Sequence, residues 1–172
     1  PPAVVDYVEF VKMLNPDGAL RHYPGSPWLA SQSLRPCDRL RLYELHSSDV
    51  KLLQECFRGA GRQVTVTAGD GFAGLKAILP PPPRRALVLI DPSYETRDDY
   101  ANVVKSLQEA LKRFATGTYA VWYPHLNKLE SRKLPDKLKR LGAANWLHVT
   151  LDVKAPAGDG FGMNGSGMFI IN

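Results

Sequence analysis

Short runs rich in Val, Ile, Leu and aromatic residues alternate along this chain with longer segments of helical periodicity, and this alternation limits the folds available to it. Four such runs, each followed by a helical segment, are predicted strands: 40–45, 64–68, 86–90 and 118–123. Two further strands, 146–153 and 168–171, are separated by a glycine-rich loop. Strands that alternate with helices favour a largely parallel α/β sheet, here ending in an antiparallel pair.

Three segments carry the more specific predictions about local structure. The apolar spacing predicts a helix over 4–14 and a long amphipathic helix over 96–115. A basic helix is expected over 128–141, with an interruption at Pro135, because proline removes one backbone donor. The strand over 86–90 is continuously apolar, a pattern typical of strands buried on both faces. No repeat, linker or low-complexity tract is visible, so we expect a single domain.

Composition excludes several classes of protein. The 172 residues contain 44% hydrophobic and 23% charged residues, with no apolar run near the roughly 18 to 20 residues of a membrane helix. The first residues show neither the basic nor the apolar region of a signal peptide, so we expect a cytoplasmic protein without membrane contact. The cysteines, Cys37 and Cys56, and the four histidines lack metal-ligand spacing, so neither a disulfide scaffold nor a metal site is expected.

The net charge of +5 is concentrated in one segment of the sequence. Between Asn127 and Gly142, six basic residues stand against two acidic ones and leave a local charge of +4. The basic residues are Lys128, Arg132, Lys133, Lys137, Lys139 and Arg140. A solvated helix face is one interpretation of this run, and contacts to RNA phosphates are the other.

An acidic residue follows or ends each of three successive predicted strands. Glu44 ends the first, Asp70 follows the second and is itself followed by Gly71, and Asp91 follows the third. Each acid can cap the helix after it. Alternatively, carboxylates at the carboxyl ends of parallel strands can accept hydrogen bonds from ribose hydroxyls, because ligands of open α/β sheets bind there.

The segment Asp91-Pro92-Ser93-Tyr94 follows the most apolar strand. One interpretation is an ordinary β-turn, since Asp and Pro are common in turns. The other is amine chemistry on a nucleobase. A carboxylate and a backbone carbonyl that accept both hydrogens of an exocyclic amine localise its lone pair, while an aromatic ring stacks on the flipped base.

The segment from Leu89 to Glu95 resembles the Asp-Pro-Pro-Tyr motif of amino-directed nucleic-acid methyltransferases. Five further blocks resemble the RlmJ-type 23S ribosomal RNA adenine-N6 methyltransferases in particular, in the order and at nearly the spacing of that family. These blocks are Arg21–Pro27, Glu44–Asp49, Asp70–Phe72, Arg113–Pro124 and Gly165–Met168. The resemblance extends over residues 20–172.

This resemblance implies a Rossmann-like methyltransferase sheet, mostly parallel with an antiparallel C-terminal pair. It implies one domain over 1–172, in which 1–19 belong to a helical insertion and 20–172 form the catalytic core. The implied methyl donor is S-adenosylmethionine. The positions that match its binding residues are Ser26, Glu44, Asp70, Gly71 and Asp91.

The same resemblance assigns the reaction to the motif itself. It implies catalytic roles for Asp91 and Pro92, and Tyr94 matches the aromatic residue that stacks on the target adenine. The implied substrate is 23S ribosomal RNA, free or partly assembled, bound by a monomer.

Two departures from the family pattern affect these expectations. Ser93 stands where the motif usually has its second proline. The family's first strand and glycine-rich cofactor loop would lie before Pro1, and the family usually continues beyond Asn172. We therefore expect a fragment or truncated homologue that lacks the central strand, and such a truncation can leave the chain inactive alone. The alternatives are a non-catalytic RNA-binding remnant and an adenine-N6 methyltransferase acting on DNA.

Overall fold

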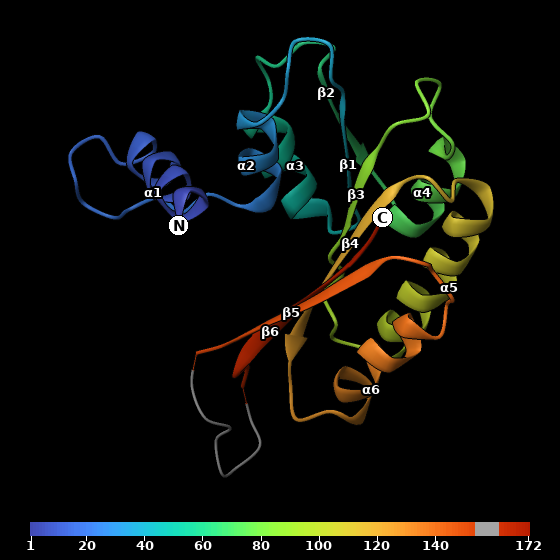
Figure 1. Ribbon diagram of the computed structural model, residues 1–172. Helices are drawn as coiled ribbons and strands as arrows, with labels where there is room; N and C mark the ends of the chain where they lie inside the picture. The colour runs from blue at the N-terminus through green and yellow to red at the C-terminus, as the bar shows by residue number, and fades with distance from the viewer. Residues whose placement is uncertain (154–161) are drawn as a thin grey trace. The chain divides into compact units, whose positions relative to one another are not determined.

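The computed structural model describes residues 1–153 and 162–172 (Figure 1). The glycine-rich loop expected between the last two strands lies mostly outside these residues. The chain divides into two compact units, Pro1–Gly71 and Phe72–Asn172. No helix in the described part of the chain is long and apolar enough to cross a bilayer.

The first unit combines three helices with a pair of parallel strands. Its elements in chain order are α1 (Pro2–Met13), α2 (Ser26–Gln32), β1 (Leu40–Glu44), α3 (Ser47–Cys56) and β2 (Val64–Ala68). β1 and β2 pair in register from Leu40 opposite Val64 to Glu44 opposite Ala68. The pairing continues one step further, because the amide of Gly69 donates to the carbonyl of Glu44 at 2.9 Å. The carboxyl ends of both strands therefore lie at the same edge.

The second unit contains a four-stranded sheet with the order β3-β4-β6-β5. α4 (Gly71–Ile78) begins at the boundary between the units. The following elements are β3 (Leu87–Ile90), α5 (Arg97–Arg113), β4 (Thr118–His125), α6 (Leu129–Lys139), β5 (Trp146–Asp152) and β6 (Gly165–Ile171). β3 and β4 are parallel, whereas β6 runs antiparallel to both β4 and β5. The predicted alternation of strands and helices and the antiparallel C-terminal pair are thus confirmed.

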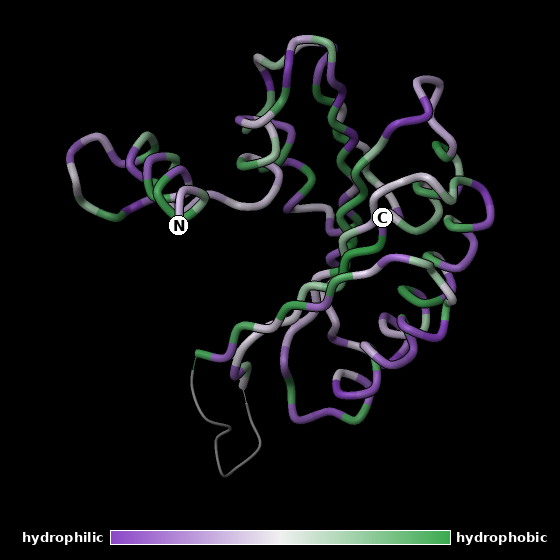
Figure 2. The backbone as a smooth tube through the Cα atoms, in the orientation of Figure 1, coloured by the Kyte–Doolittle hydropathy of each residue, from purple (hydrophilic) through white to green (hydrophobic). Residues whose placement is uncertain are grey.

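The core of the second unit lies between its sheet and the helices α5 and α6, which cover one face of the sheet in Figure 1. Helix α5 contributes Tyr100, Val103 and Leu107, all at most 1% exposed. The sheet contributes Tyr119 and Phe169, both fully buried. Figure 2 shows hydrophobic residues recurring along these strands and hydrophilic residues on both helices. Burial of these large side chains supplies most of the driving force for folding this unit.

The predicted burial of β3 on both faces is wrong. Ile90 is 7% exposed, but Leu87 is 72% and Leu89 46% exposed. The strand alternates because α5 and α6 pack against one face of the sheet only, and successive side chains point to opposite faces. By register, Leu89, Ala120, Ile170 and Leu147 share the other face.

The predicted interruption at Pro135 is also wrong, because α6 runs through this residue as one helix. Proline removes a single backbone donor and clashes with one carbonyl. The helix persists because Leu134 and Leu138, on either side of the proline, are buried in the core at 0% and 1% exposure. Tertiary packing here outweighs the local preference.

Strand β6 begins at Gly165, three residues earlier than predicted. Glycine is unfavourable in a strand interior, and so the segment from Gly165 to Gly167 was expected to belong to the loop. The structure shows what these glycines accommodate. A Cβ atom at Gly167 would lie 2.3–2.4 Å from the ring and hydroxyl of Tyr123, and one at Gly165 would lie 2.7 Å from the carboxylate of Asp152.

Candidate functional site

Two acidic positions lie at the carboxyl ends of the strands of the first unit, as predicted. Glu44 is the last residue of β1 and is half-buried, and one of its carboxylate oxygens accepts from the amide of His46 at 2.8 Å. Asp70 is exposed and precedes Gly71, the first residue of α4. Strand pairing brings the two strand ends together. Both positions remain compatible with capping the following helix and with binding a ligand.

Ser26 and Gly71 occupy the first turns of two helices. Ser26 is the exposed first residue of α2, a helix that packs against β1. A Cβ at Gly71 would lie 3.5 Å from that of Tyr43, an ordinary contact, so the fold does not require glycine there. The absence of a side chain leaves the backbone of Gly71 accessible to a ligand.

Asp91 follows β3 directly and is exposed. The protein around its carboxyl group displaces part of the hydration, and this desolvation raises the pKa of Asp91. A carboxylate that is incompletely hydrated accepts hydrogen bonds readily and holds a proton more strongly. Both properties suit a group that accepts a hydrogen bond from an amine and then takes up its proton.

Tyr94 has an unusual backbone and a buried side chain. Its φ of 56° lies in the left-handed region, which is uncommon for residues other than glycine. The side chain is 1% exposed, and its hydroxyl donates to the carbonyl oxygen of Trp122 at 2.6 Å. Burial, with the nearby charge of Asp91 as a smaller cause, raises the pKa of Tyr94 far above its ordinary value.

This burial bears on the stacking role expected of Tyr94. Its ring centroid lies 4.8 Å from that of Tyr100 and 6.4 Å from that of Trp122. A base could stack on the ring only after the ring had become exposed. The stacking role therefore stays a prediction.

Two sets of contacts fix the segment from Asp91 to Thr96, one at Thr96 and one at the carbonyls of Tyr94 and Glu95. Thr96 caps α5 through a reciprocal pair of hydrogen bonds with Asp99, at 3.0 and 3.3 Å. Lys128, which directly precedes α6, directs its ammonium group to the carbonyl oxygens of Tyr94 at 3.4 Å and Glu95 at 3.3 Å. The sequence suggested a phosphate contact for Lys128 and gave no sign of this backbone contact.

The other basic residues of the predicted RNA-binding set lie in or directly after α6. Lys139 forms an ion pair with Asp136 at 3.6 Å, and its ammonium group lies 5.3 Å from the ring centroid of Trp146. Arg132 hydrogen-bonds the side chain of Asn127. Lys133, Lys137 and Arg140 are exposed.

The sequence reasoning missed two side-chain contacts that join β4 to β5 across β6. The Nδ1 atom of His125 lies 2.7 Å from the carboxylate of Asp152. Deeper in the unit, the Tyr123 hydroxyl and His148 Nε2 form a 2.7 Å hydrogen bond. Burial raises the pKa of Tyr123 to about 12, and burial, with Lys139 as a smaller cause, lowers the pKa of His148.

The signal for these contacts was present in the spacing of Gly165 and Gly167. Each glycine lies opposite one of the β4 residues involved, so alternate glycines in a strand could have indicated side chains passing over it.

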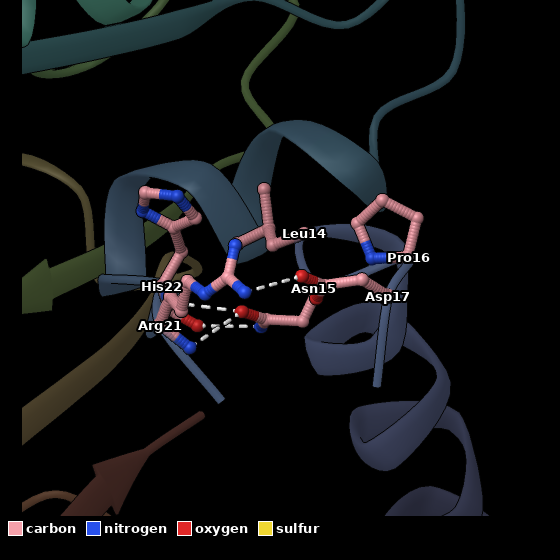
Figure 3. A pocket seen from close by; sticks show the side chains of 6 residues that line it. All are labelled: Leu14, Asn15, Pro16, Asp17, Arg21 and His22. Carbon is pink, nitrogen blue, oxygen red and sulfur yellow. Dashed lines mark hydrogen bonds and ion pairs between the residues drawn. The ribbon is translucent and has the colours of Figure 1, made fainter. Parts of the chain in front are cut away.

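A shallow cavity of about 200 Å³ lies in the first unit, and none of the predicted site residues lines it (Figure 3). Asn15, 7% exposed, organises this cavity. Its amide nitrogen donates to the carbonyls of Val11 and His22, and its oxygen accepts from the amides of Arg21 and His22. These bonds explain how the loop after α1 is fixed. Within the described part of the chain, no group of three or more His, Cys, Asp or Glu side chains could hold a metal ion.

Comparison with known proteins identifies the family. The family described as "Ribosomal RNA large subunit methyltransferase D, RlmJ" matches residues 1–172. The chain belongs to this family. An RlmJ relative, ribosomal RNA large subunit methyltransferase J of Haemophilus influenzae, is 46% identical over 100% of this chain and 61% of its own length. The predicted membership of the RlmJ family is thus confirmed.

Solved structures place this chain in the Rossmann-like methyltransferase fold. A crystal structure of protein LPL1258 from Legionella pneumophila has a TM-score of 0.91 and 35% identity, covering 100% of this chain and 63% of the other. A precorrin-6y C5,15-methyltransferase from Geobacter metallireducens, at 17% identity, has a TM-score of 0.54 over 81% of this chain and 69% of the other. The chain spans less than two thirds of the length of the Haemophilus influenzae relative and of the Legionella pneumophila protein. The predicted fold class is confirmed.

Proposed function

We propose that the protein transfers a methyl group from S-adenosylmethionine to the N6 atom of an adenine in 23S ribosomal RNA, in the cytoplasm. The observation that carries this proposal is the position of Asp91. An exposed carboxylate with a raised pKa directly follows β3, within a segment that matches the motif of amino-directed methyltransferases. Membership of the RlmJ family supports ribosomal RNA as the substrate.

The chemistry proposed for Asp91 and Pro92 follows from the weakness of the nucleophile. The lone pair of an exocyclic amine is delocalised into the adenine ring. If the Asp91 carboxylate and the Pro92 carbonyl oxygen each accept one N–H hydrogen, the lone pair is localised on nitrogen. The amine then becomes cationic as it is alkylated, and Asp91 can accept the proton it loses. Positioning supplies most of the acceleration, and no metal is required.

The residues of the first unit provide a set of hydrogen-bonding groups that suits the cofactor. The half-buried carboxylate of Glu44 can accept from two ribose hydroxyls, and the exposed Asp70 can accept from the adenine amine. Ser26 and Gly71 would complete the set with a hydroxyl and an accessible backbone. S-adenosylmethionine supplies an electrophilic methyl group when bound. We also propose that residues 20–172 act as one catalytic domain and that 1–19 belong to a helical insertion.

For the RNA we propose contacts along α6. Arg132, Lys133, Lys137 and Arg140 offer charged groups to phosphates, and Lys139 contributes less because Asp136 partly neutralises it. The substrate is free or partly assembled 23S ribosomal RNA, bound by a monomer. Lys128 differs from these residues because its ammonium group contacts the main-chain carbonyls of Tyr94 and Glu95.

The test is transfer of a tritiated methyl group from S-adenosylmethionine to unmodified large-subunit RNA, with Asp91→Ala as the blank. We expect incorporation at one adenine and a loss of at least a hundredfold in the variant, with cofactor binding retained. Asp6→Ala, which removes an exposed carboxylate from α1, is the matched control and should retain activity. Undiminished incorporation by Asp91→Ala would overturn the role of Asp91. Cofactor-independent RNA binding without transfer would favour a non-catalytic remnant.

A further inference from the structure

The connection from β3 to α5 contains the motif residues Asp91 to Tyr94 and is only six residues long. Its far end is fixed by the Thr96 cap, and the side chain of Tyr94 is fixed by its hydrogen bond to Trp122. Neither of these contacts holds the main chain of Tyr94. That main chain is the part under strain, because the φ of 56° at Tyr94 lies in the left-handed region, which disfavours residues other than glycine.

Lys128 supplies the missing main-chain contact from the neighbouring connection, between β4 and α6. Its ammonium group lies 3.4 Å from the carbonyl oxygen of Tyr94 and 3.3 Å from that of Glu95. The left-handed turn directs these successive carbonyl oxygens toward the same point. Two carbonyl dipoles converging in this way repel each other unless a cation lies between them. The lysine therefore favours the turn that Tyr94 alone would disfavour.

The same geometry limits what else Lys128 can do. An ammonium group has three N–H donors, and two of them are directed to these carbonyls. An RNA phosphate would have to compete with both contacts. The exposed lysines of α6, such as Lys133, are not held in this way by the main chain between β3 and α5.

We infer that Lys128 is a positioning residue for the reaction, one that fixes the turn at Tyr94 and thereby the orientation of the Asp91 carboxylate and the Pro92 carbonyl. This inference rests on the proposed function of Asp91 and Pro92. It concerns a residue that contacts neither the amine nor the cofactor. Removing the ammonium group should misplace the acceptors, which affects the rate of transfer more than the affinity for RNA.

The first test needs no catalysis. NMR of the full chain labelled with ¹³C and ¹⁵N reports hydrogen bonding at each carbonyl carbon. In Lys128→Met the carbonyl resonances of Tyr94 and Glu95 should move upfield, because both lose a charged donor. In Lys105→Met, which alters an exposed lysine on α5, they should not move. Unchanged resonances in Lys128→Met would overturn the inference.

The second test separates positioning from RNA binding in the transfer assay. We expect Lys128→Met to lower kcat on the order of ten- to a hundredfold with KM for RNA within twofold, and Lys128→Arg to restore part of kcat. Lys105→Met should behave as the wild type. A raised KM with unchanged kcat would identify Lys128 as an RNA contact and overturn the inference. If the wild type transfers no methyl group, the proposed function fails, whereas the carbonyl resonances still decide whether Lys128 holds the turn.

Discussion

The hydroxyl of Tyr94 donates a 2.6 Å hydrogen bond to the main-chain carbonyl oxygen of Trp122, and this bond ties the motif segment to β4. The partner oxygen belongs to a strand, so it is held in place by the sheet. Tyr94 thus serves as a structural anchor for the segment that contains Asp91, whatever further role its ring has. The stacking role would require the anchor to be released.

Replacing Tyr94 by Phe separates anchoring from stacking. Tyr94→Phe keeps the ring and removes the hydrogen bond, so we expect a loss of about 1 kcal/mol in the free energy of unfolding and a reduced kcat. Tyr119→Phe removes another buried hydroxyl, which donates to the carbonyls of Ala110 and Phe114. It should lose similar stability without a loss of transfer. Denaturant unfolding and the tritium assay measure both, and a Tyr94→Phe variant with wild-type kcat would contradict anchoring.

Reversing the charges of Lys133, Lys137 and Arg140 together tests the basic face of α6. Each phosphate contact to single-stranded RNA contributes about 0.7 to the slope of log affinity against log salt, so we expect the slope to fall by about 2. The control triple, Lys51→Glu, Lys76→Glu and Lys105→Glu, changes the net charge equally at exposed positions elsewhere. RNA affinity that responds equally to both triples would indicate attraction by net charge alone.

Gly167→Ala tests the passage of Tyr123 over β6. The added methyl group would lie within 2.4 Å of the Tyr123 ring and hydroxyl, and Tyr123 is itself 2% exposed with little room to move. We expect the free energy of unfolding to fall by about 1–3 kcal/mol. Gly59→Ala, where a Cβ meets nothing within 4 Å, is the control and should be nearly neutral. Equal stability of the two variants in thermal unfolding would show that Tyr123 leaves room for a side chain at residue 167.

The lowered pKa of His148 predicts a specific acid sensitivity. The unfolded chain takes up a proton at this residue as the pH falls through about 6.5, whereas the native state resists protonation. The free energy of unfolding should therefore decrease as the pH is lowered from about 7 to 5. His148→Gln keeps an acceptor near Tyr123 but does not titrate, so its profile should be flatter. A variant with the same slope as the wild type would show that other groups cause the acid sensitivity.

Much of the fold could be predicted because the apolar periodicity of this chain is strong. Runs such as 118–123 and the spacing of Tyr100, Val103 and Leu107 placed strands and helices close to where they lie. The predictions failed where packing outweighed local preference. Pro135 lies inside a helix that is held by its buried neighbours, and Gly167 lies inside a strand because Tyr123 crosses it.

The predicted site residues lie where strand order placed them, but their contacts could not be read from the sequence. Glu44 and Asp70 lie at neighbouring strand ends, which parallel pairing requires. The burial of Tyr94 depends on tertiary packing, and so does the contact of Lys128 with the Tyr94 carbonyl, which joins residues more than 30 positions apart in the sequence. No pattern of residue types along the chain reports such distances.

The two glycines of β6 have a consequence for how the second unit responds to change. β5 lies at one edge of the sheet and, among the described residues, pairs with β6 and no other strand, yet His148 and Asp152 contact side chains of β4 by passing over β6. A disturbance of β5 is thus transmitted directly to β4, which pairs with β3, the strand that Asp91 follows. β6, which lies between β5 and β4, does not have to move. Greater fraying of β5 should therefore be accompanied by lower order at the carboxyl ends of β4 and β3, where Asp91 follows β3.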